Sequence, residues 1–238
     1  MRIRLELEYD GTGFRGWAAQ PGHRTVEGVL RAALDAVFPR WSTLGVAGRT
    51  DAGVHAVGQV ASAEIDGGPP APRWAEALNT HLPSDVAVIS VEETAPDFHA
   101  RHSARSRTYR YRLFTRRSPS PFEMHRSWWH PRPLNEAALF RAARLLHGEH
   151  DFRAFTPTET QHERFRRVVE EARWARDGDY LDFWITADSF LRHMVRTLVG
   201  TMLERPPEGL ELLLRGAERH DAGTTAPPWG LYLARVKY

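Results

Sequence analysis

The chain contains no cysteine, a single lysine and no long apolar run. The lack of cysteine excludes disulfides, thiolate zinc sites and a cysteine nucleophile. No stretch approaches the roughly 20 consecutive apolar residues that a membrane-spanning helix needs. The first residues, MRIRLELEYDG, lack the apolar core of a secretory signal, so we expect a cytoplasmic protein.

Because Lys237 is the only lysine, nearly all of the 32 basic residues are arginines. Arginine suits bidentate phosphate contacts and stacking on bases, although a genomic bias toward arginine also accounts for the total. The distribution is more informative, because no Asp or Glu lies between Phe98 and Phe122. Basic and aromatic residues are interleaved there, which is typical of a nucleic-acid surface; the alternative is a solvated strand face. They are Arg101, Arg105, Arg107, Arg110, Arg112, Arg116, Arg117, Tyr109, Tyr111 and Phe114.

Apolar periodicity predicts alternating strands and helices. Residues 2–9 alternate between apolar and charged side chains, as a half-buried strand does. From Val26 the apolar residues follow a helical spacing, with Thr25 as the N-cap. The remaining predicted elements are strands at 57–65, 86–91, 105–114, 165–175, 180–186 and 230–238, and helices at 72–82, 135–147, 189–203 and 208–215.

The first half of the chain therefore runs strand, helix, strand, helix, strand, and the second half follows the same alternation with a hairpin of two strands and a pair of helices in place of single elements. This order predicts an α+β protein of two related α/β units, residues 1–103 and 104–238. The pair Asp177-Gly178 predicts a hairpin turn in the second unit. On the helix predicted at 189–203, Arg192 and Arg196 would share one face at the i, i+4 spacing.

Two sequence patterns that could mark a cofactor site lack the neighbouring elements that such a site needs. Gly11, Gly13 and Gly16 fit the spacing G-x-G-x-x-G of dinucleotide sites. Such a site needs a buried parallel strand before it and a helix start directly after it, whereas the preceding strand alternates and the next helix begins near residue 25. The 12 histidines are scattered and none completes a zinc-helix pattern, so we expect neither a metal nor a nucleotide cofactor.

The segment GRTDAGVHA, residues 48–56, places Asp51 between an arginine and a glycine turn. An aspartate in such a turn is usually structural, accepting backbone N–H groups. The neighbouring Arg49 changes the available chemistry, because a nearby positive charge keeps a carboxylate ionised. An ionised, oriented carboxylate can act as a nucleophile without metal or cofactor.

This segment resembles the active-site motif of the TruA-type tRNA pseudouridine synthases, and the resemblance covers nearly the whole chain. Five further blocks occur in the same order as in that family; one departure is Ala18, where the family often has glutamine. The blocks are YDGTGF with Gly16, Trp17 and Gln20; LNT with Leu82-Pro83; FHAR with Ser103-Ala104 and Tyr109-Arg110-Tyr111; HMVR with Leu198-Val199-Gly200; and APP with Gly230-Leu231 and residues 236–238.

The resemblance implies roles for individual residues. Asp51 corresponds to the nucleophile that attacks the target uridine, and Tyr109 to the tyrosine that stacks on the flipped base. Arg196 corresponds to an arginine that pairs with the aspartate, and Arg49 to one that helps displace the base. Further RNA contacts are expected at Arg24, Arg101 and Arg107.

The resemblance also implies a fold, a substrate and a quaternary state. The fold is a pair of ferredoxin-like or RRM-like α/β units joined into one mostly antiparallel mixed sheet, with helices on one side and a central active-site cleft. The enzyme would be a cofactor-free homodimer that modifies tRNA positions 38, 39 and 40.

Two alternatives come from other classes of protein. Paired α/β units with aromatic strands also describe non-catalytic RRM-like RNA-binding proteins, but residues 107–113 lack the glycine that the RNP1 pattern requires. A carboxylate-pair hydrolase would need a second acid, and the Asp51 motif contains none, although a partner distant in sequence remains open.

Overall fold

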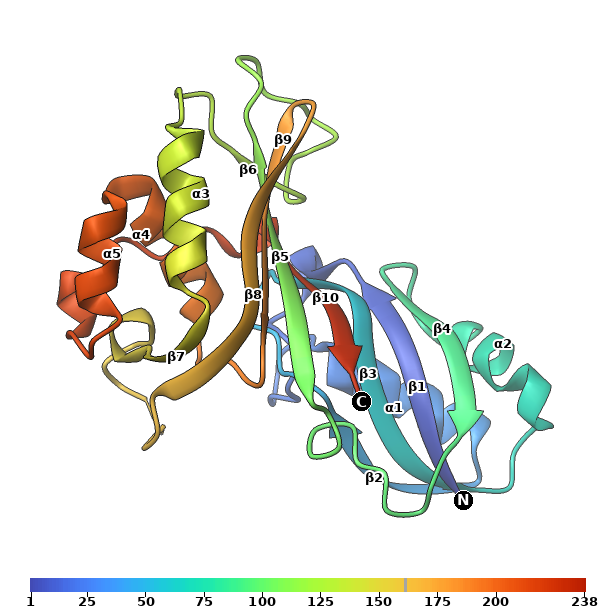
Figure 1. Ribbon diagram of the computed structural model, residues 1–238. Coiled ribbons are helices and arrows are strands. Elements are labelled where there is room, and N and C mark those ends of the chain that lie inside the picture. The colour runs from blue at the N-terminus through green and yellow to red at the C-terminus, as the bar shows by residue number, and fades with distance from the viewer. Residues whose placement is uncertain (161) are drawn as a thin grey trace. The chain divides into compact units, whose positions relative to one another are not determined.

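A computed structural model describes residues 1–160 and 162–238 (Figure 1). Its contacts divide the chain into two compact units. Unit 1 comprises Met1–Arg105 and Tyr232–Tyr238, and unit 2 comprises Ser106–Leu231. The sequence predicts a division between residues 103 and 104, with all later residues in the second unit. The structure instead returns the C-terminal segment to unit 1.

The sheet of unit 1 is built around the long strand β3. Strands β4 (Val86–Glu93), β1 (Arg2–Tyr9) and β3 (His55–Asp66) are antiparallel neighbours in that order. Strand β2 (Arg40–Val46) pairs antiparallel with one half of β3, and β10 (Leu231–Lys237) pairs parallel with the other. The alternation predicted at residues 2–9 is confirmed, because every second side chain of β1 is buried.

Helix α1 (Val26–Val37) covers one face of this sheet (Figure 1). The predicted cap is confirmed, since the Thr25 side chain accepts a hydrogen bond from the Gly28 N–H. Helix α2 (Trp74–Asn79) is shorter than predicted, because a 3-10 turn (Ala71–Arg73) precedes it. At its end, the Asn79 amide pairs with both backbone groups of Val88 at 2.8 Å, which ties α2 to β4.

The sheet of unit 2 has the antiparallel order β5-β9-β8-β7. These strands are β5 (Ser106–Phe114), β9 (Tyr180–Ala187), β8 (Arg166–Asp177) and β7 (Gly148–Asp151). The two-residue strand β6 (Trp128–Trp129) pairs parallel with β5. The predicted hairpin is confirmed, because Asp177 pairs with Tyr180 across a turn in which Gly178 has a φ of 54°.

Three helices lie on one side of this sheet (Figure 1): α3 (Glu136–Leu145), α4 (Met194–Glu204) and α5 (Pro207–Leu213). The prediction for α4 is wrong at its start. His193 adopts a left-handed conformation with φ 63°, so the helix begins five residues later than the pattern predicts. Arg192 therefore lies outside α4 and does not share a helical face with Arg196.

Each unit combines helices with a mostly antiparallel sheet, which confirms the predicted α+β class. The two parallel pairs reported above make the strand pairing mixed. Within residues 1–160 and 162–238, no helix is long and apolar enough to cross a membrane.

Candidate active site

Asp51 lies in the loop between β2 and β3, where the chain makes a tight turn. The Val54 N–H donates to the Asp51 carbonyl at 3.1 Å, and Gly53 closes the turn with a φ of 77°. A side chain at position 53 would be strained in this left-handed conformation. Asp51 itself is half-buried, so the fold leaves part of this residue exposed.

The glycine-rich loop after β1 packs directly on the Asp51 turn. A Cβ atom on Gly11 would lie 2.0 Å from the Val54 carbonyl oxygen, and one on Gly16 would lie 2.7 Å from the Thr50 carbonyl oxygen. The Trp17 N–H donates to that Thr50 oxygen at 3.0 Å. These glycines thus allow two backbone segments to approach closely, and the G-x-G-x-x-G spacing serves the Asp51 turn.

A buried network of polar side chains supports the same turn. The hydroxyls of Tyr9 and Thr50 share a hydrogen bond of 2.8 Å. The Gln59 amide, which is fully buried, donates to the Tyr9 oxygen at 3.2 Å and to the Gly48 carbonyl at 2.7 Å. Burial raises the pKa of Tyr9 to about 12, so its hydroxyl stays protonated at neutral pH.

His55, at the end of the turn, contacts one segment near the start of the chain and one near its end. The Gly11 N–H donates to its Nδ1 at 3.0 Å, and an Asp10 carboxylate oxygen lies 3.2 Å from the same nitrogen. Its imidazole is 2% exposed and stacks on the Tyr232 ring, with centroids 4.6 Å apart. Three segments of unit 1 therefore meet at this one side chain.

Arg49 and Arg24 flank this region in different ways. Arg49 is exposed and makes no hydrogen bond or ion pair within the described residues, so it does not hold the Asp51 carboxylate as the sequence suggests. Its charge acts on Glu27: burial raises the pKa of that carboxyl, but the Ala19 N–H, Arg31 and Arg49 together lower it below its usual value. Arg24 forms a bidentate ion pair with Asp85, at 2.7 and 2.8 Å, and braces the glycine loop.

In unit 2, Tyr109 lies on a strand and Arg196 lies on a helix. Tyr109 projects from β5 and meets the Phe190 ring edge-on, with centroids 4.8 Å apart. Arg196 is half-buried on α4, and its Nε donates to the Ala226 carbonyl at 2.7 Å. Arg107, at the start of β5, donates to the Asp188 carbonyl at 2.9 Å.

Residues 222–228, which we name the strap, cross α4 and fix Arg196. The Ala226 N–H donates to the Arg196 carbonyl at 3.1 Å, and the Thr225 and Thr197 hydroxyls share a bond of 3.1 Å. A Cβ atom on Gly200 would lie 1.9 Å from the Thr224 carbonyl oxygen, so the helix and the strap are in backbone contact.

Tyr111 connects the strap to β5. Its hydroxyl donates to the Pro227 carbonyl at 2.8 Å. Burial holds the pKa of the Tyr111 phenol well above its ordinary value, although the charge of Arg196 lowers it. The side chain is therefore a neutral hydrogen-bond donor that couples the strand of Tyr109 to the segment that holds Arg196.

The family model described as tRNA pseudouridine synthase matches residues 7–103 and 142–238. The chain belongs to this family. Three bacterial relatives, each a tRNA pseudouridine synthase A, are 42% identical to it. The protein of Moorella thermoacetica aligns over 99% of both chains; that of Geobacillus kaustophilus aligns over 100% of this chain and 94% of its own; and that of Thermus thermophilus aligns over 100% and 96%.

Among solved structures, a chain of a Cbf5-Nop10-Gar1 complex covers 98% of this chain and 58% of its own length. The sequence identity is 13% and the TM-score is 0.40, which is too low to support a shared function. Membership of the tRNA pseudouridine synthase family makes the chain an isomerase that modifies tRNA, and it displaces the reading as a non-catalytic RRM-like protein.

The residues predicted from sequence fall into two groups in this family member. Unit 1 brings Asp51, Arg49 and Arg24 to the glycine loop and the Asp51 turn, and unit 2 carries Tyr109, Arg107 and Arg196. Arg101 lies in unit 1, exposed, with its backbone N–H on the His99 ring at 3.1 Å. Within the described residues, no group of three or more acidic, histidine or cysteine side chains could hold a metal ion.

The sequence motifs do not single out Gln59 or the threonines of the strap, which support these side chains. Gln59 carried one weak signal, a polar residue in an apolar strand. The threonines of the strap carried none, because their partners are distant in sequence.

Proposed function

We propose that this enzyme converts uridine to pseudouridine at positions 38, 39 and 40 of tRNA, with Asp51 as the nucleophile. The observation that carries the proposal is the support of the Asp51 turn. Close glycine backbone contacts, a buried tyrosine–glutamine network and His55 support the turn, while Asp51 itself is half-buried and so keeps part of its surface exposed.

The reaction places modest demands on the protein. The C1′–N1 bond breaks, the base turns over, and a C1′–C5 bond forms, while C5 loses a proton and N1 gains one. Atoms and electrons balance within the nucleoside, so no redox partner or energy source is consumed. A carboxylate that captures the reacting nucleoside covalently, and later leaves, is sufficient as the catalytic group.

The target nucleotide must first leave its stack, at a cost of a few kcal/mol. Arg49 is suited to occupying the vacated space, since its guanidinium is exposed and unpaired in the described structure. Tyr109 offers an aromatic face for the extruded base, a contact worth about 1–3 kcal/mol. Arg196 has the role of supporting the carboxylate, as the family resemblance implies. We further propose that the enzyme is cytoplasmic and works as a homodimer on one tRNA.

The test is the variant Asp51→Asn, assayed by release of tritium from C5-labelled uridine in tRNA transcripts with one target uridine each. We expect tRNA affinity to be retained and turnover to be lost. Asp97→Asn, an exposed aspartate of the same unit, is the matched control and should keep full activity. Tritium release by Asp51→Asn at the control's rate would remove Asp51 from the mechanism.

A further inference from the structure

Residues 115–133, which we name the basic loop, connect β5 to α3 and contain β6. The loop holds four arginines but one acidic residue, Glu123. That carboxylate already accepts a hydrogen bond of 2.8 Å from the Tyr180 hydroxyl. The loop therefore presents a net positive charge that its own acid does little to neutralise.

The basic loop is organised by its own hydrogen bonds. The Arg116 guanidinium donates from Nε to the Ser118 carbonyl at 3.1 Å and from Nη2 to the Pro119 carbonyl at 3.0 Å. The Trp129 indole donates to the Arg116 carbonyl at 2.9 Å. A side chain that is fixed before binding loses less conformational entropy when a ligand arrives.

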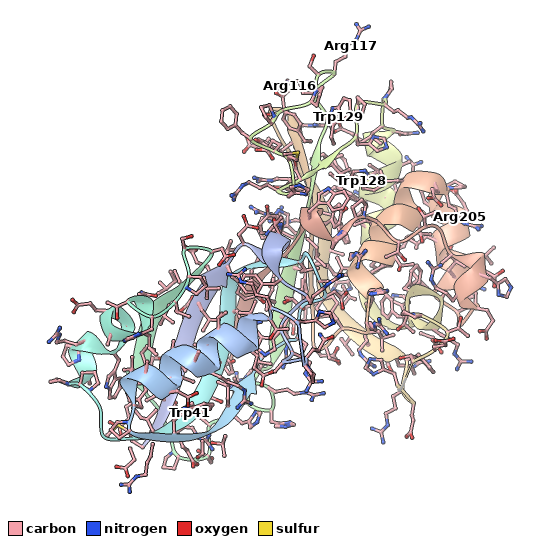
Figure 2. All side chains as sticks on the ribbon, turned by 180° about the vertical axis from the view of Figure 1, so that it is seen from behind. Trp41, Arg116, Arg117, Trp128, Trp129 and Arg205 are labelled. Carbon is pink, nitrogen blue, oxygen red and sulfur yellow. The ribbon has the colours of Figure 1, made fainter. Side chains whose placement is uncertain are left out.

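The groups that the loop exposes are aromatic and cationic. Phe122 is 84% exposed and Trp129 is 41% exposed. Arg117 is exposed and makes no hydrogen bond or ion pair with any residue that the structure describes. Figure 2 shows Arg116, Arg117 and Trp129 close together on the loop, with Arg117 extending away from it. Arg116 uses two of its five N–H donors internally, which leaves the others for an anion.

We propose that the basic loop is a second tRNA-binding platform, in which Phe122 and Trp129 stack on unpaired bases and Arg116 and Arg117 bind phosphates. The proposal rests on the proposed function, which makes tRNA the substrate. Aromatic faces beside guanidinium groups are the combination that binds unstacked nucleotides. A second copy of the chain fits less well at a two-fold axis through the loop, because such a contact would bring two basic loops together.

The experiment compares full-length variants that differ only in surface side chains. Phe122→Ala and Arg117→Ala alter the platform. Their matched controls are Leu212→Ala, which is 66% exposed, and Arg205→Ala, an exposed arginine elsewhere on unit 2 (Figure 2). Dissociation constants for a full-length tRNA transcript are measured by fluorescence anisotropy across a series of salt concentrations, with light scattering of each protein at the same concentrations.

Phe122→Ala should weaken tRNA binding about fivefold or more, as the loss of one stacked base does. Arg117→Ala should lower the slope of log Kd against log salt by about one. The controls should bind within about twofold of the unaltered chain. Platform variants that bind like the controls would overturn the proposal. So would a loss of affinity that accompanies dissociation of a dimer and disappears at higher protein concentration, because the loop would then join two copies.

Failure of the proposed function would look different. An unaltered chain that binds tRNA through the basic loop but releases no tritium would refute the isomerase assignment and leave the platform standing.

Discussion

The Asp51 turn and the Arg196 helix are both held in place by a second backbone segment, but the means differ. Asp51 depends on glycines, because Gly11 and Gly16 let two loops touch where no Cβ fits. Arg196 sits on a helix where Gly200 likewise admits the backbone of the strap, and threonine hydroxyls supply further bonds. A glycine contact cannot take even one methyl group, whereas the hydroxyl bonds of the strap can be lost one at a time. Substitution of a contact glycine at the Asp51 turn should therefore cost more stability than the loss of one threonine hydroxyl in the strap.

The largest expected effect is that of Gly11→Ala. Its methyl group would lie 2.0 Å from the Val54 carbonyl oxygen, so the glycine loop or the Asp51 turn must move. We expect the free energy of unfolding to fall by about 3 kcal/mol or more, with loss of turnover. Denaturant unfolding gives the first quantity and tritium release the second.

Gly13→Ala is the matched control, since its nearest neighbour is the terminal Nη1 of Arg24 at 3.1 Å, and a side-chain end can yield by a small shift where the Val54 backbone cannot. Both variants change the unfolded chain equally. Equal stability of the two would show that the loops are not in obligate contact.

The buried Tyr9 hydroxyl, which supports the Asp51 turn, makes the free energy of unfolding depend on pH. Its pKa is about 12 in the fold against 10.0 in a model peptide, because burial disfavours the phenolate. The stability that this shift contributes is fully present below pH 10 and is lost as the pH rises to 12. The loss amounts to about 3 kcal/mol.

The measurement is the free energy of unfolding between pH 7 and 12 for the unaltered chain and for Tyr9→Phe. The variant should be less stable at neutral pH by about 1–2 kcal/mol, since Thr50 and Gln59 lose a buried partner. Its stability should fall less steeply above pH 10. Parallel curves would mean that Tyr9 ionises equally easily in the folded and unfolded states.

The smallest effect is expected in the strap. Thr225→Val removes the hydroxyl that bonds to Thr197 and to the Arg219 guanidinium. The free energy of unfolding should fall by about 1 kcal/mol, with turnover largely kept because the backbone bond from Ala226 to Arg196 remains. Thr158→Val, at an exposed site, is the control in the same unfolding assay. A loss as large as that of Gly11→Ala would erase the distinction between the two regions.

Local patterns allowed some of these features to be predicted. The alternation of β1 and the cap at Thr25 are properties of a few adjacent residues, and both are confirmed. Strand β2 could not be predicted, because its half-exposed residues do not alternate and Thr43 has a φ of 53°. The start of α4 was misplaced for a similar reason: nothing local marks His193 as left-handed.

The candidate site shows the same limit. The motif around Asp51 is visible as residue types in order, whereas the contacts that support it are not. Gln59, His55 and the strap act through partners that are far away in sequence, and the glycine spacing alone also fits a nucleotide site. Sequence patterns report chemistry and periodicity, but the close approach of two backbones is a property of the folded chain.

The return of β10 to unit 1 has a consequence for how this protein is made. Tyr232, which stacks on His55, and Leu233, which lies beside Ala56, are translated long after the Asp51 turn has left the ribosome. Until residues 232–238 emerge, β3 lacks this parallel neighbour and the His55 imidazole has no Tyr232 ring to stack on. The nascent chain therefore carries an Asp51 turn that lacks one of its supports, and synthesis must run through these residues before that support is in place.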